Sequence, residues 1–312
     1  MMKALVTGGA GFIGSHLCLQ LLSREFSVVA IDNLITSSGE NIRLLEKNNN
    51  FTFIKHDIVH PLSKSDKTKL NNVSVIFHFA CPTGVPNLVT LQEEMLLTCS
   101  IGTHNILELA RKEKASVIFA STSEIYGNPL VFPQSEEYTG NVDSTGIRSP
   151  YEEGKRFSES LVMAYVRKYA LDAKIARIFN TYGPGSSAFE TRIIPKFLRL
   201  ARDNKPLPVE GDGTQTRTFC YVDDLVDGIL RIYKKGSSGG VYNVGSDREV
   251  PVALLAEKII ALTGSKSRVE YIRRPSHDHN RRLPLLNKIR GLGWNPVVDL
   301  EEGLRKTSEL LA

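Results

Sequence analysis

The stretch VTGGAGFIG, residues 6–14, decides the fold that we expect for this chain. It spaces Gly9, Gly11 and Gly14 as GxGxxG, and Gly8 adds a GxxGxxG frame. The stretch follows an apolar run and opens a helical pattern, and its glycines let the backbone turn tightly and approach a pyrophosphate. The N–H groups and the dipole of a helix N-terminus attract such an anion. The stretch therefore predicts a dinucleotide site rather than a purely structural glycine-rich turn.

The first half of the chain alternates apolar, strand-like runs with helical patterns. The runs lie at 3–7, 27–32, 51–57, 73–80, 116–121 and 173–179, and the clearest helical patterns at 96–112 and 152–170. Such runs, separated by helices, are typical of a parallel sheet that is buried on both faces. We therefore expect an α/β chain, with a doubly wound parallel-sheet Rossmann fold over 1–180 that is rejoined by about 215–245. A smaller C-terminal substrate-binding α/β cap is expected over 181–312.

Asp32 ends the second predicted strand and bears on the choice of cofactor. A carboxylate at this place accepts hydrogen bonds from ribose hydroxyls and repels a 2′-phosphate. No arginine follows it closely, so the pattern favours NAD over NADP. Asp57 and Ala80 end the next strands and are expected to meet the adenine and the nearer ribose. The residues that we expect to contact the cofactor are Gly8, Gly11, Phe12, Ile13, Gly14, Asp32, Asn33, Asp57, Ile58, Ala80, Tyr151 and Lys155.

Tyr151 and Lys155 lie four residues apart at the start of a predicted helix, so both side chains belong to one helix face. A phenol with a reference pKa of about 10 is a weak base at neutral pH. A nearby ammonium and the charge of an oxidised nicotinamide would stabilise its phenolate, which then accepts a proton from a hydroxyl as hydride leaves. Alone, such a pair indicates an aromatic core contact beside a solvated lysine. Together with the glycine stretch, it predicts a catalytic base.

The stretch STSEIYG, residues 121–127, follows the strand-like run SVIFA. Small hydroxyl residues at a strand end are ordinary turn chemistry, which accounts for Ser121 and Ser123. A carboxylate has no such explanation. We therefore predict that Thr122 and Glu124 belong to the same site as the tyrosine and lysine.

The composition excludes several classes of partner. The chain has 39 basic and 34 acidic residues, a net charge of +5, and its basic residues are scattered, so we expect no nucleic-acid partner. No run approaches the roughly 18 apolar residues of a membrane span, and MMKALVTGGAG leaves no room for a signal peptide. Four widely spaced cysteines indicate reduced thiols and a cytoplasmic protein. His277 and His279 lack a third ligand nearby, so we expect no metal.

Six stretches relate the chain to a known family: STSEIYG, PQSEEYTGNV, YEEGKR, ARIFNTYGP, GDGTQTRTFCYVDDLVDG and LGWNPVVDLEEGL. Through them the chain resembles, over nearly its whole length, the extended short-chain dehydrogenase/reductases that act on nucleotide-activated sugars. Within that family the resemblance is strongest to the UDP-glucuronate decarboxylases. It implies NAD as the cofactor, a nucleotide sugar (a UDP-sugar) as the substrate, and a homodimer that packs helices around 87–111 and 151–170.

The same resemblance implies roles for single residues. The catalytic group would be Thr122, Glu124, Tyr151, Lys155 and Arg282, and the substrate would be held by Asn180, Arg192, Arg217 and Arg282. By charge alone, Arg192 and Arg217 are either surface cations or ligands of a diphosphate, which arginine binds bidentately. The choice of Arg282 over its neighbours Arg273, Arg274 and Arg281 comes from the family match.

Glu124 separates three possible reactions. In a decarboxylase, oxidation at C4 gives a ketone β to the C6 carboxylate, and carbon dioxide then leaves. Glu124 would position a water or deliver the C5 proton, and Thr122 would donate a hydrogen bond to the C4 oxygen. C4 is then reduced again. A 4,6-dehydratase would use Glu124 to remove the C5 proton, and many carry aspartate where this chain has Ser123. A 4-epimerase usually has a small residue at position 124.

Three residues depart from the decarboxylase pattern and concern recognition of the sugar. Leu88 lies where a tyrosine is usual, Cys99 where an asparagine is usual, and Gly185 where an arginine is usual. Decarboxylation of UDP-glucuronate is the function that we expect, and dehydration or epimerisation of another nucleotide sugar stays open. A non-catalytic dinucleotide-binding protein is disfavoured, because the tyrosine and lysine are both present.

Overall fold

Seven parallel strands form the main sheet of the computed structural model, which describes residues 1–185, 191–273 and 281–310. Their order across the sheet is β11-β6-β5-β4-β1-β2-β3, and it reverses between β1 and β4, the place where open α/β sheets bind ligands. This sheet confirms the predicted doubly wound Rossmann fold. The strands are β1 (Lys3–Thr7), β2 (Ser27–Asp32), β3 (Phe51–Lys55), β4 (Val75–His78), β5 (Ser116–Thr122), β6 (Ala173–Ile178) and β11 (Val241–Val244).

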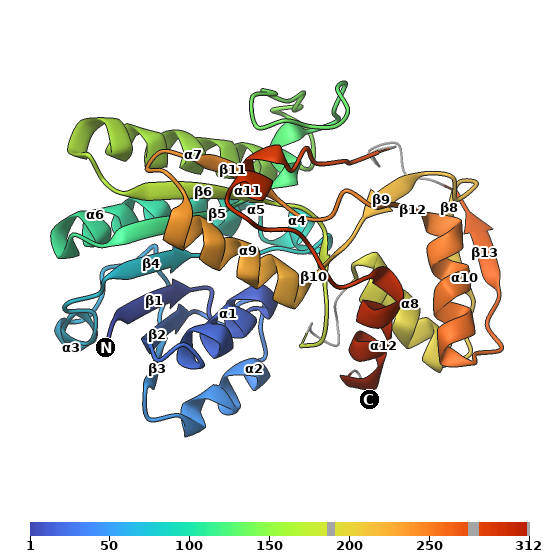
Figure 1. Cartoon of the computed structure of the whole chain (residues 1–312), viewed down its shortest axis with the longest axis horizontal. Coiled ribbons are helices and arrows are strands. Elements are labelled where there is room, and N and C mark those ends of the chain that lie inside the picture. Colours follow the sequence, from blue (N-terminus) through green and yellow to red (C-terminus); the bar gives the residue numbers. More distant parts are fainter. Residues whose placement is uncertain (186–190, 274–280, 311–312) are drawn as a thin grey trace.

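Helices cover both faces of the main sheet (Figure 1). Val6 of β1 packs in one core cluster with side chains of α1 (Phe12–Leu22) and α9 (Val222–Lys235). Its neighbour Leu5 packs in the other cluster, with α6 (Thr103–Glu113) and α7 (Ser149–Tyr169). Successive strand residues point to opposite faces, so a sheet covered on both sides needs continuous apolar strands. For this reason the strands could be recognised as apolar runs in the sequence.

A second group of elements, which we call the cap, lies beside the carboxyl ends of the main strands (Figure 1). It contains helices α8 (Ile193–Arg202), α10 (Val252–Thr263) and α12 (Leu300–Leu310). Its strands pair as β8 (Leu207–Glu210) with β13 (Val269–Ile272) and as β9 (Thr216–Thr218) with β12 (Glu249–Pro251). Short strands β7 (Thr181–Tyr182) and β10 (Cys220–Tyr221) pair where the chain crosses between the two groups. Between β10 and β12 the chain returns to the main sheet through α9 and β11.

The helical segment expected at 96–112 contains a π-helical turn. Helix α5 (Gln92–Leu97) passes into the π-turn η2 (Thr98–Gly102) before α6 begins. A Cβ atom on Gly102 would lie 2.9 Å from Ile58 Cδ1, so the wide turn brings the backbone close to Ile58. Such turns occur frequently at functional sites. The remaining elements are α2 (Glu40–Arg43), η1 (Leu45–Lys47), α3 (Lys64–Lys69), α4 (Asn87–Thr90), η3 (Ser123–Tyr126) and α11 (Asn287–Gly291).

Among the described residues, none of the helices has both the length and the apolar character that crossing a membrane requires.

Gly14 has no room for a side chain. A Cβ atom there would overlap the carbonyl oxygen of Gly8, because α1 packs directly on the glycine loop. We expect Gly14→Ala to lower the free energy of unfolding by about 1–3 kcal/mol, the usual cost of overpacking. Urea denaturation measures this. Gly291→Ala is the matched control, because a Cβ atom on Gly291 meets nothing within 4 Å. Equal stability of the two variants would contradict the prediction.

Candidate active site

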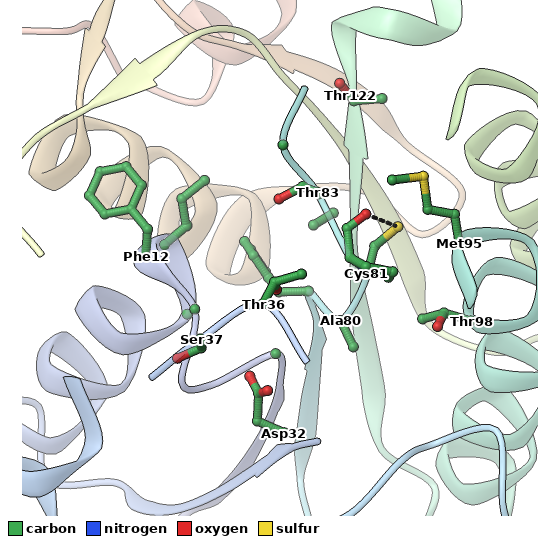
Figure 2. A pocket seen from close by; sticks show the side chains of 18 of the residues that line it. Phe12, Asp32, Thr36, Ser37, Ala80, Cys81, Thr83, Met95, Thr98 and Thr122 are labelled. Carbon is green, nitrogen blue, oxygen red and sulfur yellow. Dashed lines mark hydrogen bonds between the residues drawn. The ribbon is translucent and has the colours of Figure 1, made fainter. Parts of the chain in front are cut away.

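A cavity of about 630 Å³ opens at the carboxyl ends of the main strands. The glycine loop and the loops after β2 and β4 form one part of its wall, and the end of β5 with the start of α7 forms another (Figure 2). Asn180 and Arg192 complete it from the side of the cap. Every site residue predicted from the sequence lines this cavity except Arg217 and Arg282.

The glycine loop has the shape that a pyrophosphate requires. Gly8 has a φ of 72°, and a Cβ atom on it would lie 2.8 Å from the backbone nitrogen of Ala80. Helix α1 starts after Gly11 without a side chain that caps it, so its first N–H groups keep their capacity to bind an anion. Phe12 and Ile13, in that first turn, line the cavity. These residues fit the phosphates of a dinucleotide.

Asp32 is held in place at the end of β2. Its carboxylate accepts the N–H groups of Ala10 at 3.0 Å and of Leu34 at 2.8 Å. Burial raises the pKa of Asp32, and the backbone hydrogen bonds oppose this effect. Asn33 donates to Asp57 at 2.9 Å, which joins the ends of β2 and β3. Each carboxylate oxygen of Asp32 keeps a further lone pair for a ribose hydroxyl.

Replacement of Asp32 tests this part of the cavity. We expect Asp32→Asn to weaken NAD⁺ binding by about tenfold, because a hydrogen bond to a charged group contributes about 1.5–3 kcal/mol. The same change should reduce the preference for NAD⁺ over NADP⁺, because the repulsion of a 2′-phosphate is lost. Titration calorimetry with both cofactors measures the two affinities. Asp66→Asn, on the distant helix α3 (Lys64–Lys69), is the control. An unchanged preference for NAD⁺ over NADP⁺ would show that Asp32 does not bind the ribose.

Tyr151, Lys155 and Thr122 meet where β5 ends and α7 begins. Lys155 is buried, donates to the carbonyl oxygen of Ala120 at 2.8 Å, and lies over the ring of Phe119. The Tyr151 hydroxyl shares a hydrogen bond with Thr122. Burial raises the pKa of Tyr151, the hydrogen bond with Thr122 opposes this, and the structure therefore holds a neutral phenol beside the cavity.

Glu124 lies between two guanidinium groups. Arg282 reaches it with two nitrogens, Nη1 at 2.5 Å from Oε1 and Nη2 at 2.9 Å from Oε2, and Arg148 forms an ion pair with Oε2. Arg282 also donates to the hydroxyl of Ser123 at 3.3 Å. Arg282 is buried behind the carboxylate and does not line the cavity. Both contacts fix the carboxylate in one orientation next to Thr122.

Arg148 is a site residue that the sequence reasoning missed. It precedes α7, lines the cavity, and also donates from Nε to Glu152 at 3.1 Å. Burial and the charge of Glu124 raise the pKa of Glu152, and Arg148 opposes both. The sequence did offer a signal for Arg148. It lies three residues before the predicted catalytic tyrosine and four before Glu152, a spacing at which the two side chains can pair on one helix face.

The two other predicted arginines lie in different surroundings. The guanidinium of Arg192, at the start of α8, lies 5.6 Å from the ring centroid of Phe12, so it meets the glycine loop. Arg217, in β9, donates to the carbonyl oxygen of Thr216 and is not part of the cavity wall. The structure therefore brings Arg192 to the site and leaves Arg217 outside this cavity.

The loop after β4 gives the cavity a wall with few polar groups. Val85 in the loop, Leu88 in α4 and Met95 in α5 line the cavity. Figure 2 shows Cys81, Thr83 and Met95 on this side. Leu88 is buried at the position where a tyrosine was expected. Within the described ranges no cluster of side chains suits a metal ion, and His277 and His279 lie outside those ranges.

A glycine loop under a helix, a carboxylate at the end of β2 and a tyrosine–lysine pair around one cavity define a dinucleotide-dependent enzyme. The model of the NAD dependent epimerase/dehydratase family matches residues 4–245, and the chain belongs to this family. Family membership confirms the predicted resemblance and the predicted cofactor, NAD.

Individual relatives carry out different reactions on nucleotide sugars. UDP-glucuronic acid decarboxylase 3 of Arabidopsis thaliana is 40% identical over 305 residues, which cover 97% of this chain and 87% of the relative. The dTDP-glucose 4,6-dehydratase of Streptomyces venezuelae, solved with NAD, has a TM-score of 0.89 at 29% identity and covers 99% of this chain and 96% of its own. UDP-glucuronic acid 4-epimerase of Bacillus cereus, solved with UDP-glucuronic acid and NAD, also has a TM-score of 0.89 at 29% identity, covering 99% of both chains.

Proposed function

We propose that this protein is an NAD-dependent carboxy-lyase that converts UDP-glucuronate to the corresponding UDP-pentose. The observation that carries the proposal is Glu124, fixed by Arg148 and Arg282 beside the tyrosine base. A carboxylate at this place serves chemistry at C5, which a simple hydride shuttle would not need. The similarity to the decarboxylases over 97% of the chain supports the same reaction.

The main sheet and the cap would bind different parts of the cofactor and the substrate. The glycine loop would hold the pyrophosphate and Asp32 the ribose, while Asn180 and Arg192 reach the cavity from the side of the cap, where a nucleoside diphosphate would lie. When bound, NAD⁺ would accept a hydride from C4 of the sugar, return it to the same carbon, and supply a positive charge that favours the phenolate of Tyr151.

The side chains at the end of β5 would handle the protons. Tyr151 takes the proton of the C4 hydroxyl, and Thr122 donates a hydrogen bond to the C4 oxygen. The C4 ketone lies β to the C6 carboxylate, so loss of carbon dioxide leaves the electron pair on the ketone oxygen as an enolate. Glu124 then delivers to C5 a proton taken from solvent, or orients the water that protonates C5, and Tyr151 returns its proton to the C4 oxygen.

A 4,6-dehydratase is the second candidate, because one observation favours it. The segment 79–86, after β4, contains no charged residue, and Val85 and Leu88 line the cavity there. Such a wall suits a neutral hexose better than a sugar carboxylate. In that reaction Glu124 would remove the C5 proton. An epimerase is a weaker alternative, since it has no use for a carboxylate at C5.

We further propose a homodimer in the cytoplasm. Leu96, Ile101 and Phe157 are exposed apolar residues on α5, η2 and α7, and these three elements pack against one another. A second copy would cover them, which light scattering after size exclusion would detect. The four cysteines, all within the described residues, are unpaired, as is usual in a reducing compartment.

Mass spectrometry of the products distinguishes the candidate reactions. The protein is incubated with NAD⁺ and, separately, with UDP-glucuronate, UDP-glucose and dTDP-glucose. The proposal expects a product lighter by carbon dioxide from UDP-glucuronate and no change in the neutral sugars. Loss of water from a neutral sugar would establish the dehydratase, and a product of unchanged mass with a new retention time would establish the epimerase.

A further inference from the structure

Two cysteines that are distant in sequence meet at the edge of the cavity. Cys81 follows β4, lines the cavity, and lies next to Ala80 in its wall (Figure 2). Cys99 is buried in the π-turn η2 behind it. Their Sγ atoms are 3.7 Å apart. The two thiols are therefore in direct contact, one open to the cavity and one behind it.

The pair is wedged between the cavity loop and the helix that carries the catalytic base. Cys99 Sγ lies 3.2 Å from the point that a Cβ atom on Gly154 would occupy, so glycine at this position makes room for the sulfur. Gly154 comes between Tyr151 and Lys155 on α7. The hydroxyl of Ser158, one turn further along, donates to the carbonyl oxygen of Cys99 at 2.6 Å. A movement of either sulfur is thus transmitted to the start of α7 or to the loop at Ala80.

The surroundings make Cys99 the more acidic thiol of the pair. The hydrogen bond from Cys81 lowers the pKa of Cys99 to about 7, the positive charge of Lys155 acts in the same direction, and burial opposes both. The same hydrogen bond raises the pKa of Cys81. By contrast, burial raises the pKa of Cys18 and of Cys220. A thiolate in contact with a second thiol is the reactive arrangement for disulfide formation.

We propose that Cys81 and Cys99 form a redox-modification site, at which hydrogen peroxide joins them in a disulfide that reversibly inactivates the enzyme. The thiolate of the pair attacks one peroxide oxygen and releases hydroxide, which gives a sulfenic acid. The sulfur of the other cysteine attacks the sulfenic sulfur, the S–S bond forms, and the sulfenic oxygen leaves as water. Two thiols and one peroxide become one disulfide and two waters, so the two sulfurs lose the two electrons that the peroxide gains.

The disulfide would disturb the site because bonded sulfurs lie much closer together than 3.7 Å. The two cysteine side chains must therefore rotate, and the segments that carry them shift, until the sulfurs are within bonding distance. Ala80, next to Cys81, lies against Gly8 of the glycine loop, and Gly154, next to Cys99, lies between the catalytic residues of α7. A displacement of about 1 Å at a reacting centre can lower the rate by about 100-fold.

The chemistry of the thiols can be tested without knowing the substrate. The full chain is treated with hydrogen peroxide, its remaining thiols are alkylated, and its peptides are mapped by mass spectrometry. We expect a peptide pair linked through Cys81 and Cys99, alkylated Cys18 and Cys220 after unfolding, and loss of the link after dithiothreitol. Separate alkylation or separate overoxidation of Cys81 and Cys99, with no link between them, would overturn the proposal.

Two variants connect the disulfide to inactivation. NAD⁺ affinity and turnover are compared before peroxide, after peroxide, and after dithiothreitol. The native protein and Cys220→Ser should each lose activity by about 100-fold and recover it. Cys99→Ser, compared with its own untreated sample, should lose none. If the linked protein keeps its NAD⁺ affinity and turnover, or if Cys99→Ser is inactivated equally, the pair is not a switch. The mapping reports on the disulfide even if the proposed reaction is wrong.

Discussion

Tyr151→Phe is expected to lower kcat by about 10²–10⁴-fold, the usual contribution of a general acid–base group. The phenol lies at the cavity beside Thr122, and Tyr151 is half-buried at the start of α7. Phenylalanine keeps the ring and removes the oxygen that accepts the C4 proton. The KM for the nucleotide sugar should change little, because Tyr151 acts on the reacting hydroxyl and the nucleotide is held elsewhere.

A tyrosine on the same helix provides the control for this change. Tyr169, at the end of α7, is exposed and far along the helix from the cavity. Tyr169→Phe should therefore keep kcat within about twofold of the native value, as surface changes usually do. If Tyr151→Phe keeps native turnover while it folds normally by circular dichroism, the phenol is not the base and the account of C4 oxidation is wrong.

Glu124→Gln is expected to lower product formation by about 10²–10³-fold and to leave oxidation at C4 in place. Glutamine keeps the shape of the side chain but cannot carry the C5 proton. The reaction should then stop after the first half, and reduced cofactor should accumulate on the enzyme. Stopped-flow fluorescence of the bound dihydronicotinamide measures this accumulation, which the native enzyme should show only transiently.

The loss of the negative charge also leaves Arg148 and Arg282 facing an uncharged group. Removal of one partner from a buried ion pair destabilises a protein, so thermal unfolding must accompany the kinetics. Glu137→Gln removes a carboxylate that pairs with Lys288 at the surface and is the matched control. Full product formation by a folded Glu124→Gln, without reduced cofactor, would exclude Glu124 from the chemistry at C5.

The sequence was most informative where one local pattern determined the structure. The central residues of the runs at 27–32 and 116–121, which are 28–31 and 117–120, are all apolar because the sheet is buried on both sides, so β2 and β5 could be recognised without any partner strand. Positions 8, 11 and 14 require glycine because a Cβ atom there would lie too close to the backbone of Ala80 or of the loop itself. Local rules of this kind predicted the fold and the position of the cavity.

The same local rules could not predict contacts between segments that are distant in the sequence. Nothing near Arg148 indicates that its guanidinium reaches Glu124, because that ion pair depends on how the segment before α7 crosses the end of β5. Cys81 and Cys99 were interpreted as separate reduced thiols, and their contact arises from the π-turn η2, which periodicity does not predict. Arg217 was assigned to the substrate by resemblance, and the structure leaves it outside this cavity. Its role in binding the nucleotide stays a prediction.

We propose that the enzyme removes carbon dioxide from UDP-glucuronate and protonates C5 from a group in equilibrium with solvent. The most direct measurement is the mass and the proton spectrum of the product formed in deuterium oxide with NAD⁺. We expect a UDP-pentose that carries a single carbon-bound deuterium, at C5, and no net reduction of the cofactor. A six-carbon UDP-uronate epimerised at C4 with no deuterium at C5, or unchanged UDP-glucuronate, would contradict it.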